Sequence, residues 1–178
     1  TIHILEGFDH LLFVLALILI VPGWWMLVKT ITAFTLAHSV TLALATLGIV
    51  NMPGPPTEAV IALSILFLAV EIIHSHEGKV TLTERAPWLV SLSFGLVHGL
   101  GFAGALAEVG LPSGEIPLAL VAFNSGIELG QLLFVGLLQV LSSLPGKRTW
   151  PRALVPVPTY AIGALATFWI LDRSWNLF

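Results

Sequence analysis

The sequence contains no cysteine, and only 10% of its 178 residues are charged. The absence of cysteine excludes a disulfide framework, a thiolate zinc site, an iron–sulfur cluster and a cysteine nucleophile. Any bound metal must therefore be held by His and carboxylate side chains. Soluble globular domains usually carry about 25% charged residues. The scarcity of charge indicates an integral membrane protein rather than a soluble domain.

Basic residues are also scarce. Lys and Arg number 7 against 10 Asp and Glu, which gives a net charge of -3 and leaves no basic surface for nucleic acid. The chain has no Gly-x4-Gly-Lys-Ser/Thr loop, so it lacks the usual signature of a nucleotide-driven pump. Nucleic-acid binding is therefore excluded as a function class, and any transport would be secondary or driven by the membrane potential.

Hydrophobic residues make up 57% of the chain. Turn residues and charges divide it into six apolar segments without strand-like alternation, each about as long as a membrane-spanning helix. These segments are residues 3–21, 27–49, 57–75, 87–109, 115–143 and 155–172. We therefore predict an all-α fold, a polytopic bundle of about six spans that forms a single transmembrane domain over residues 1–178.

Six of the seven Lys and Arg residues fall on one side of these predicted spans. They occupy the first, third and fifth connections: Lys29, Lys79, Arg85, Lys147, Arg148 and Arg152. By the positive-inside rule these connections are cytoplasmic, so both chain ends are predicted to lie outside. The chain begins with Thr1 and its first span starts at once. We therefore expect that a signal peptide or an outer segment has been removed.

Ionisable residues inside a span are costly, and by default they mark a functional site. On a helix of about 3.6 residues per turn, His3, Glu6 and His10 share one face of the first span, with Asp9 beside Glu6. The second to fifth spans add further polar residues: His38, Ser64, Glu71, His98, Asn124, Glu128 and Gln131. A rise of about 1.5 Å per residue predicts that His10, His38 and His98 lie near the midplane.

The chain also shows an internal similarity. Phe34-Thr35-Leu36-Ala37-His38 is matched by Phe94-Gly95-Leu96-Val97-His98. Glu58 and Glu71 have the same spacing as Glu115 and Glu128. We therefore predict an internal repeat in which spans two and three correspond to spans four and five, a construction common in transporters.

Imidazole, carboxylate and amide ligands suit Ni²⁺, Co²⁺, Zn²⁺ or Fe²⁺. Two function classes remain open, because a permease needs ligands that form and break during its cycle, whereas a hydrolase needs a closed metal site and a general base. In the hydrolase, His10, His38 and His98 would hold a zinc ion. Glu128 or Asp9 would then act as the base. A scaffold that only packs around these groups does not explain so many ionisable residues at one depth.

The string His3-x5-Asp9-His10 resembles the signature of the HupE/UreJ family of bacterial nickel and cobalt permeases. Residues 32–42, 95–102 and 123–131 are most similar to the second branch of that family. The resemblance implies metal-contacting roles for His3, Asp9, His10 and His98. Better-studied members carry a further His and Glu in the fourth-span motif, at the positions of Phe94 and Gly101.

We therefore expect a multi-pass permease of the bacterial cytoplasmic membrane, surrounded by lipid, that moves Ni²⁺ or Co²⁺ inward. The alternative is an intramembrane zinc-dependent hydrolase, so the sequence leaves open whether the protein is an enzyme. No oligomeric state is indicated. The residues expected to contact the metal ion are His3, Glu6, Asp9, His10, His38, His98, Asn124, Glu71 and Glu128. The first two would capture the ion outside, and the last two would pass it inward.

Overall fold

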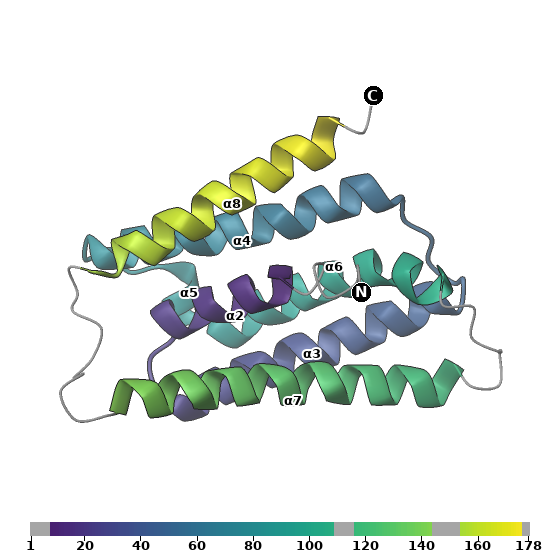
Figure 1. Cartoon of the computed structure of the whole chain (residues 1–178), viewed down its shortest axis with the longest axis horizontal. Coiled ribbons are helices and arrows are strands. Elements are labelled where there is room, and N and C mark those ends of the chain that lie inside the picture. The colour runs from purple at the N-terminus through teal and green to yellow at the C-terminus, as the bar shows by residue number, and fades with distance from the viewer. Residues whose placement is uncertain (1–7, 109–115, 144–153, 176–178) are drawn as a thin grey trace.

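Figure 1 shows the computed structural model, which describes residues 8–108, 116–143 and 154–175. These residues form seven helices and no strand, so the predicted all-α fold is confirmed for this part of the chain. The helices are α2 (Phe8–Ile20), α3 (Trp24–Thr46), α4 (Gly54–His76), α5 (Leu82–Arg85), α6 (Pro87–Glu108), α7 (Ile116–Ser143) and α8 (Pro156–Trp175).

Six of these helices coincide with the six predicted apolar segments, with ends that differ by a few residues. α3 begins three residues earlier than predicted, because Gly23 adopts a φ of 82° and turns the chain directly after Pro22. The short α5 was not predicted. It forms because Thr81 and Glu84 cap each other's backbone N–H groups in a capping box.

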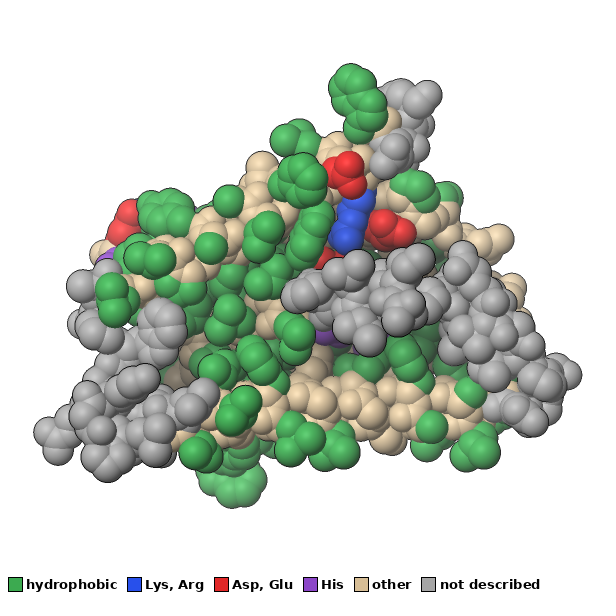
Figure 2. Space-filling model, in the orientation of Figure 1, with side chains coloured by type: hydrophobic (Ala, Val, Ile, Leu, Met, Phe, Trp, Pro, Cys, Tyr) green, Lys and Arg blue, Asp and Glu red, His purple; other side chains and the backbone are tan. Residues whose placement is uncertain are grey.

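Within the described ranges, three helices are long and apolar enough to cross a membrane: α3, α4 and α7 over Ile116–Val140. α2 is a shorter apolar helix. The outer face of α7 is strongly apolar, since Leu118, Val121, Leu129 and Leu133 are 60–75% exposed. Figure 2 shows hydrophobic side chains over much of the visible face. An apolar exterior of this extent is typical of helices that face lipid.

The helices pack in layers. Figure 1 shows α4 and α8 on one side, α3 and α7 on the other, and α2 and α6 between them. α2 forms the centre of the core, where Phe13, Ala16 and Leu17 are completely buried. In lipid, close van der Waals packing of this kind holds helices together, because lipid tails are as apolar as the side chains.

α6 packs directly on α3 through two glycines. A Cβ on Gly95 would meet the carbonyl oxygen of Phe34. A Cβ on Gly99 would meet the carbonyl oxygen of His38 and the hydroxyl of Thr41. Small residues four positions apart let two helix backbones approach closely. This contact sets His98 on α6 beside the α3 turn that carries His38.

The described basic residues lie near helix ends. The Lys29 ammonium group at the start of α3 lies 5.5 Å from the centroid of a Trp88 ring at the start of α6. Lys79 and Arg85 lie in the segment that joins the end of α4 to the start of α6, and therefore at the same end of the bundle as Trp88 and Lys29. Arg173 lies near the C-terminal end of α8 and contacts Glu58 near the start of α4. It is therefore at the end of the bundle opposite to the other three.

Candidate metal-binding site

Three predicted site histidines from different helices come together in the interior. The ring centroid of His10 on α2 lies 5.5 Å from that of His38 on α3 and 5.3 Å from that of His98 on α6. The three residues are 7%, 0% and 0% exposed. His10 therefore lies at the centre of a buried cluster of imidazoles, which we call the histidine cluster.

Phenylalanine side chains surround the histidine cluster. The Phe34 ring stacks on His38 with centroids 5.9 Å apart, and it meets His10 and His98 edge to face at 5.6 and 5.0 Å. Phe13 lies 5.5 Å from His98 and 4.8 Å from Phe34. Aromatic rings prefer such edge-to-face and offset contacts. The two phenylalanines therefore fix the directions of the imidazole rings.

A hydrogen bond to Ser64 on α4 orients His98. The Nε2 atom of His98 lies 3.0 Å from the Ser64 hydroxyl, which also lies 2.6 Å from the carbonyl oxygen of Ile61. When the single hydroxyl proton goes to Ile61, the Ser64 oxygen accepts a hydrogen bond from Nε2–H. The lone pair of His98 is then on Nδ1, which has no hydrogen-bond partner among the described residues. Such bonds decide which imidazole nitrogen faces a metal.

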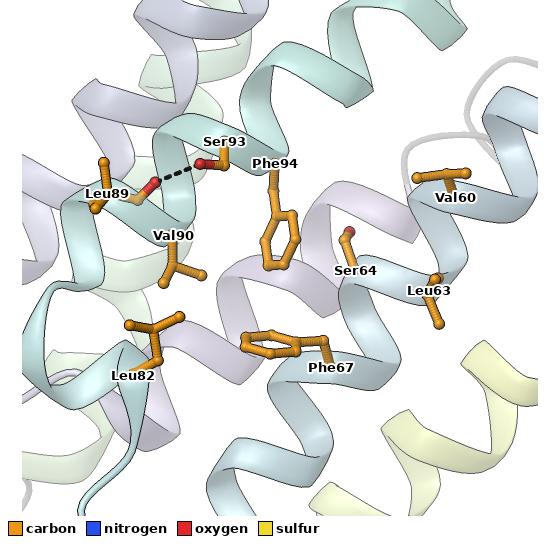
Figure 3. A pocket seen from close by; sticks show the side chains of 9 residues that line it. All are labelled: Val60, Leu63, Ser64, Phe67, Leu82, Leu89, Val90, Ser93 and Phe94. Atoms are coloured by element: carbon orange, nitrogen blue, oxygen red, sulfur yellow. Dashed lines mark hydrogen bonds between the residues drawn. The ribbon is translucent and has the colours of Figure 1, made fainter.

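Ser64 also lines a cavity of about 380 Å³ between α4, α5 and α6. Figure 3 shows the rings of Phe67 and Phe94 near its centre, and their centroids are 5.5 Å apart. The lining is apolar except for Ser64 and Ser93. The Ser93 hydroxyl donates to the Leu89 carbonyl oxygen. Ser64 therefore touches both this cavity and His98. In the sequence, Ser64 stands out only as a polar residue within an apolar segment, and the predicted site did not include it.

Asp9 precedes His10 but has a basic partner in the structure. Its Oδ2 atom accepts a hydrogen bond from Nη2 of Arg173 at 3.0 Å. Arg173 also donates from Nη1 to the Glu58 carbonyl oxygen at 3.0 Å, and its Nε lies 3.5 Å from the Glu58 carboxylate. The predicted metal ligand Asp9 is therefore engaged in an ion pair between α2 and α8.

α7 presents a polar stripe to the interior, formed by residues spaced i, i+4 and i+7 along the helix: Asn124, Glu128 and Gln131. Asn124 and Gln131 are buried, and the Asn124 amide donates to the Leu120 carbonyl oxygen at 2.8 Å. The Asn124 Oδ1 atom has no hydrogen-bond partner among the described residues. Glu128 accepts a hydrogen bond from the Thr32 hydroxyl of α3 at 2.8 Å. Gln131 was not in the predicted site, although its spacing from Asn124 placed it on the same stripe.

Two predicted ligands, His3 and Glu6, lie outside the described residues. Within residues 8–108, 116–143 and 154–175, no group of three His, Asp or Glu side chains is arranged to hold a metal ion. The members of the histidine cluster are therefore close neighbours that do not form a complete coordination site in this conformation.

A comparison with family models gives one match, described as HupE / UreJ protein, over residues 1–173. The chain belongs to the HupE/UreJ family. The match covers nearly the whole chain, including His3 and Glu6, and it is to the second model of that name, as the motifs indicated. Membership is consistent with a membrane protein related to nickel or cobalt transport. No curated protein and no solved structure matches the chain.

Glu71 of this HupE/UreJ protein stabilises a helix connection. Its Oε2 atom accepts a hydrogen bond from the backbone N–H of Thr83, in the first turn of α5, at 2.7 Å. Backbone N–H groups at a helix start have few other partners and favour an anion. Nearby, hydrogen bonds from the Ser75 hydroxyl and the Thr81 backbone N–H lower the pKa of Glu84. Glu71 thus links α4 to α5. Its contact with the metal ion stays a prediction.

We expect Glu71→Ala to lower the free energy of unfolding by about 1–3 kcal/mol, because the Thr83 N–H loses its charged acceptor. An unchanged metal affinity would limit Glu71 to this structural contact. Unfolding of the purified protein in detergent, followed by tryptophan fluorescence, and a metal titration measure the two effects. Glu77→Ala is the control, since the Glu77 side chain is exposed and pairs with Lys79, whose side chain is also exposed. Normal stability with lost metal binding would instead place Glu71 on the ion path.

Proposed function

We propose that this HupE/UreJ protein is a permease that carries a divalent transition metal ion, Ni²⁺ or Co²⁺, across the bacterial cytoplasmic membrane. The observation that carries this proposal is the histidine cluster, formed by His10, His38 and His98 from three helices. Imidazole nitrogen is a good ligand for both ions. Ionisable groups inside the helices of a membrane protein are costly and typically line ion pathways. The metal ion is the substrate of the protein.

The proposed topology has six spans, with both termini outside. α2, α3, α4, α6, α7 and α8 correspond to the six predicted segments and support this arrangement. We assign the helix ends near Lys29, Lys79 and Arg85 to the cytoplasm by the positive-inside rule. Asp9 and Arg173 then lie toward the outer face.

The proposal includes an internal repeat, in which α3 and α4 correspond to α6 and α7. Reciprocal contacts support it, because α3 packs on α6, α3 contacts α7, and α6 contacts α4. The matched histidines, His38 and His98, then stand on the two helices that meet at the centre. Transporters built from repeats usually bind their substrate at such an interface.

In the proposed path, His3 and Glu6 collect the hydrated ion, and Asp9 and His10 receive it. His38 and His98 replace its water, and Asn124 and the carboxylates of Glu128 and Glu71 offer oxygen ligands for the exit. The ligands must draw together as the ion enters, and a carrier needs bonds that form and break. An inside-negative potential favours inward movement by about 2.3 kcal/mol per charge for each 100 mV.

Uptake by purified protein in liposomes tests this function. We expect Ni²⁺ or Co²⁺ to accumulate when the interior is made negative, and metal analysis after washing to find weak, exchangeable binding. One stoichiometric zinc ion that resists washing, together with no uptake, would overturn the proposal and support the intramembrane hydrolase. Binding of no divalent ion under any condition would count against both functions.

We expect Ser64→Ala to weaken Ni²⁺ or Co²⁺ binding about 10- to 100-fold, as is typical when the partner that orients a ligand histidine is removed. Stability should fall by only about 1 kcal/mol, because a single hydrogen bond is lost. Calorimetric titration of the purified protein measures the affinity. Ser93→Ala is the matched control, since Ser93 lines the same cavity but bonds only its own helix. Equal affinities in the two variants would remove Ser64 from the site.

A further inference from the structure

Arg173 occupies the place beside Asp9 that a metal ion on the proposed path must take. The guanidinium Nη2 lies 3.0 Å from Asp9 Oδ2, and the Arg173 and Asp9 side chains are only 18% and 11% exposed. Asp9 directly precedes His10, the central residue of the histidine cluster. Asp9, a proposed ligand of the ion, therefore already holds a cation, which is supplied by the chain itself.

Three further contacts hold this cation. Arg173 donates to the Glu58 carbonyl oxygen at 3.0 Å, and its Nε lies 3.5 Å from the Glu58 carboxylate. The Trp169 ring, one turn earlier on α8, lies 5.4 Å from the centre of the guanidinium. Figure 2 shows a basic side chain between acidic ones at the C-terminal end of α8. Planar guanidinium groups suit such combined carboxylate and aromatic contacts.

Arg173 lies at the end of a helix, close to the surface. It lies in the last turns of α8, whose described part ends at Trp175, and its side chain reaches the surface. The Glu58 side chain, one of its partners, is 49% exposed and offers an alternative contact nearer to water. A long, flexible side chain at a helix end keeps its charge in water when it swings outward.

We infer that Arg173 is a tethered cation that competes with the metal ion for Asp9 and closes the outer side of the site when no ion is bound. This inference rests on the proposed function. Removing Arg173 takes a positive charge away from a largely buried carboxylate, which is costly unless another cation takes its place. Arg173 and the ion therefore oppose each other's binding, a coupling that typically amounts to about 5- to 150-fold in affinity.

Titration of the purified full-length chain with Co²⁺ tests the inference. We expect Arg173→Gln to bind Co²⁺ about tenfold more tightly than the unchanged protein, and Arg173→Lys, which retains the charge, to bind nearly as the unchanged protein does. Asp9→Asn should bind weakly, and adding Arg173→Gln to it should bring no gain. Lys79→Gln is the control for loss of a positive charge, since Lys79 lies at the other end of the bundle.

A second measurement needs no variant. Phenylglyoxal modifies accessible arginines, and mass spectrometry reports the modification of Arg173 relative to that of Arg85. We expect Co²⁺ to speed the modification of Arg173 only. A rate unchanged by Co²⁺, or equal or weaker Co²⁺ binding by Arg173→Gln, would overturn the inference and leave the proposed function intact. If neither the unchanged protein nor Arg173→Gln binds the ion, both the inference and the proposed function fail.

Discussion

Replacing His10 with Phe is expected to abolish metal binding and uptake while the protein stays folded. His10 is the member of the histidine cluster that contacts both other imidazoles. Phe removes both ring nitrogens, yet retains an aromatic ring to pack on Phe34. Loss of a partner that only orients a ligand typically costs about 10- to 100-fold in affinity, so we expect loss of the ligand itself to cost about 100-fold or more.

Co²⁺ titration and uptake by liposomes measure this effect, with tryptophan fluorescence as the check on folding. His76→Phe is the matched control, because His76 is exposed at the end of α4. It lies 12 positions along that helix from Ser64, the α4 residue that contacts His98. We expect the control to bind Co²⁺ normally. Normal uptake by His10→Phe would exclude the histidine cluster as the transport site and leave these imidazoles with a packing role only.

Replacing Gly99 with Ala is expected to cause the largest loss of stability among single methyl additions in the described helices. The new Cβ would meet the His38 carbonyl oxygen, the Thr41 hydroxyl and the Leu42 backbone nitrogen, the last at 2.9 Å. Two of these groups are backbone and cannot turn aside. α6 must therefore move away from α3, and overpacking of this kind typically costs about 1–3 kcal/mol, occasionally more.

Gly130→Ala is the matched control on α7, because nothing lies within 4 Å of the position of its Cβ. There the added methyl group should raise stability by up to about 1 kcal/mol, since Ala favours a helix more than Gly does. Thermal unfolding in detergent, followed by tryptophan fluorescence, compares the two variants. Equal midpoint temperatures of unfolding would show that α3 and α6 accommodate the added methyl group at little cost. The close approach of the two helices would then not be needed to position His98.

The effect on metal binding should follow the effect on stability. A displacement of α6 moves His98 away from His10, because the helix contact at Gly99 fixes the depth at which His98 stands. We therefore expect the folded fraction of Gly99→Ala to bind Co²⁺ more weakly than Gly130→Ala does. Weaker binding per folded molecule would show that Gly99 positions His98. A mere decrease in the amount of folded protein would leave the affinity unchanged.

The elements of the fold were predictable because they depend on local sequence. Apolar runs of about 20 residues favour helices, and Pro and Gly end them. α5 was missed because it is four residues long and depends on the pair Thr81 and Glu84. Hydrophobicity gave no sign of it, although the Thr-x2-Glu spacing of a capping box was present in the sequence.

The sequence by itself also determined which residue types were available for chemistry. Without cysteine, the candidates were His, carboxylates and amides within apolar segments, and the matched strings around His38 and His98 directed attention to two of them. The family followed from the same strings. Helical periodicity further placed Asn124 and Gln131 on one stripe, and both are buried.

Only the tertiary structure decided which of these polar groups meet. Arg173 and Asp9 are 164 positions apart, and Ser64 and His98 are 34 apart. Periodicity says which face of a helix a residue occupies, but not which helix lies opposite or at what height. Those two quantities depend on packing between helices, here on the approach of α6 to α3 at Gly95 and Gly99. That packing brings His10, His38 and His98 together, while Asp9 pairs with Arg173 and Glu71 with the start of α5.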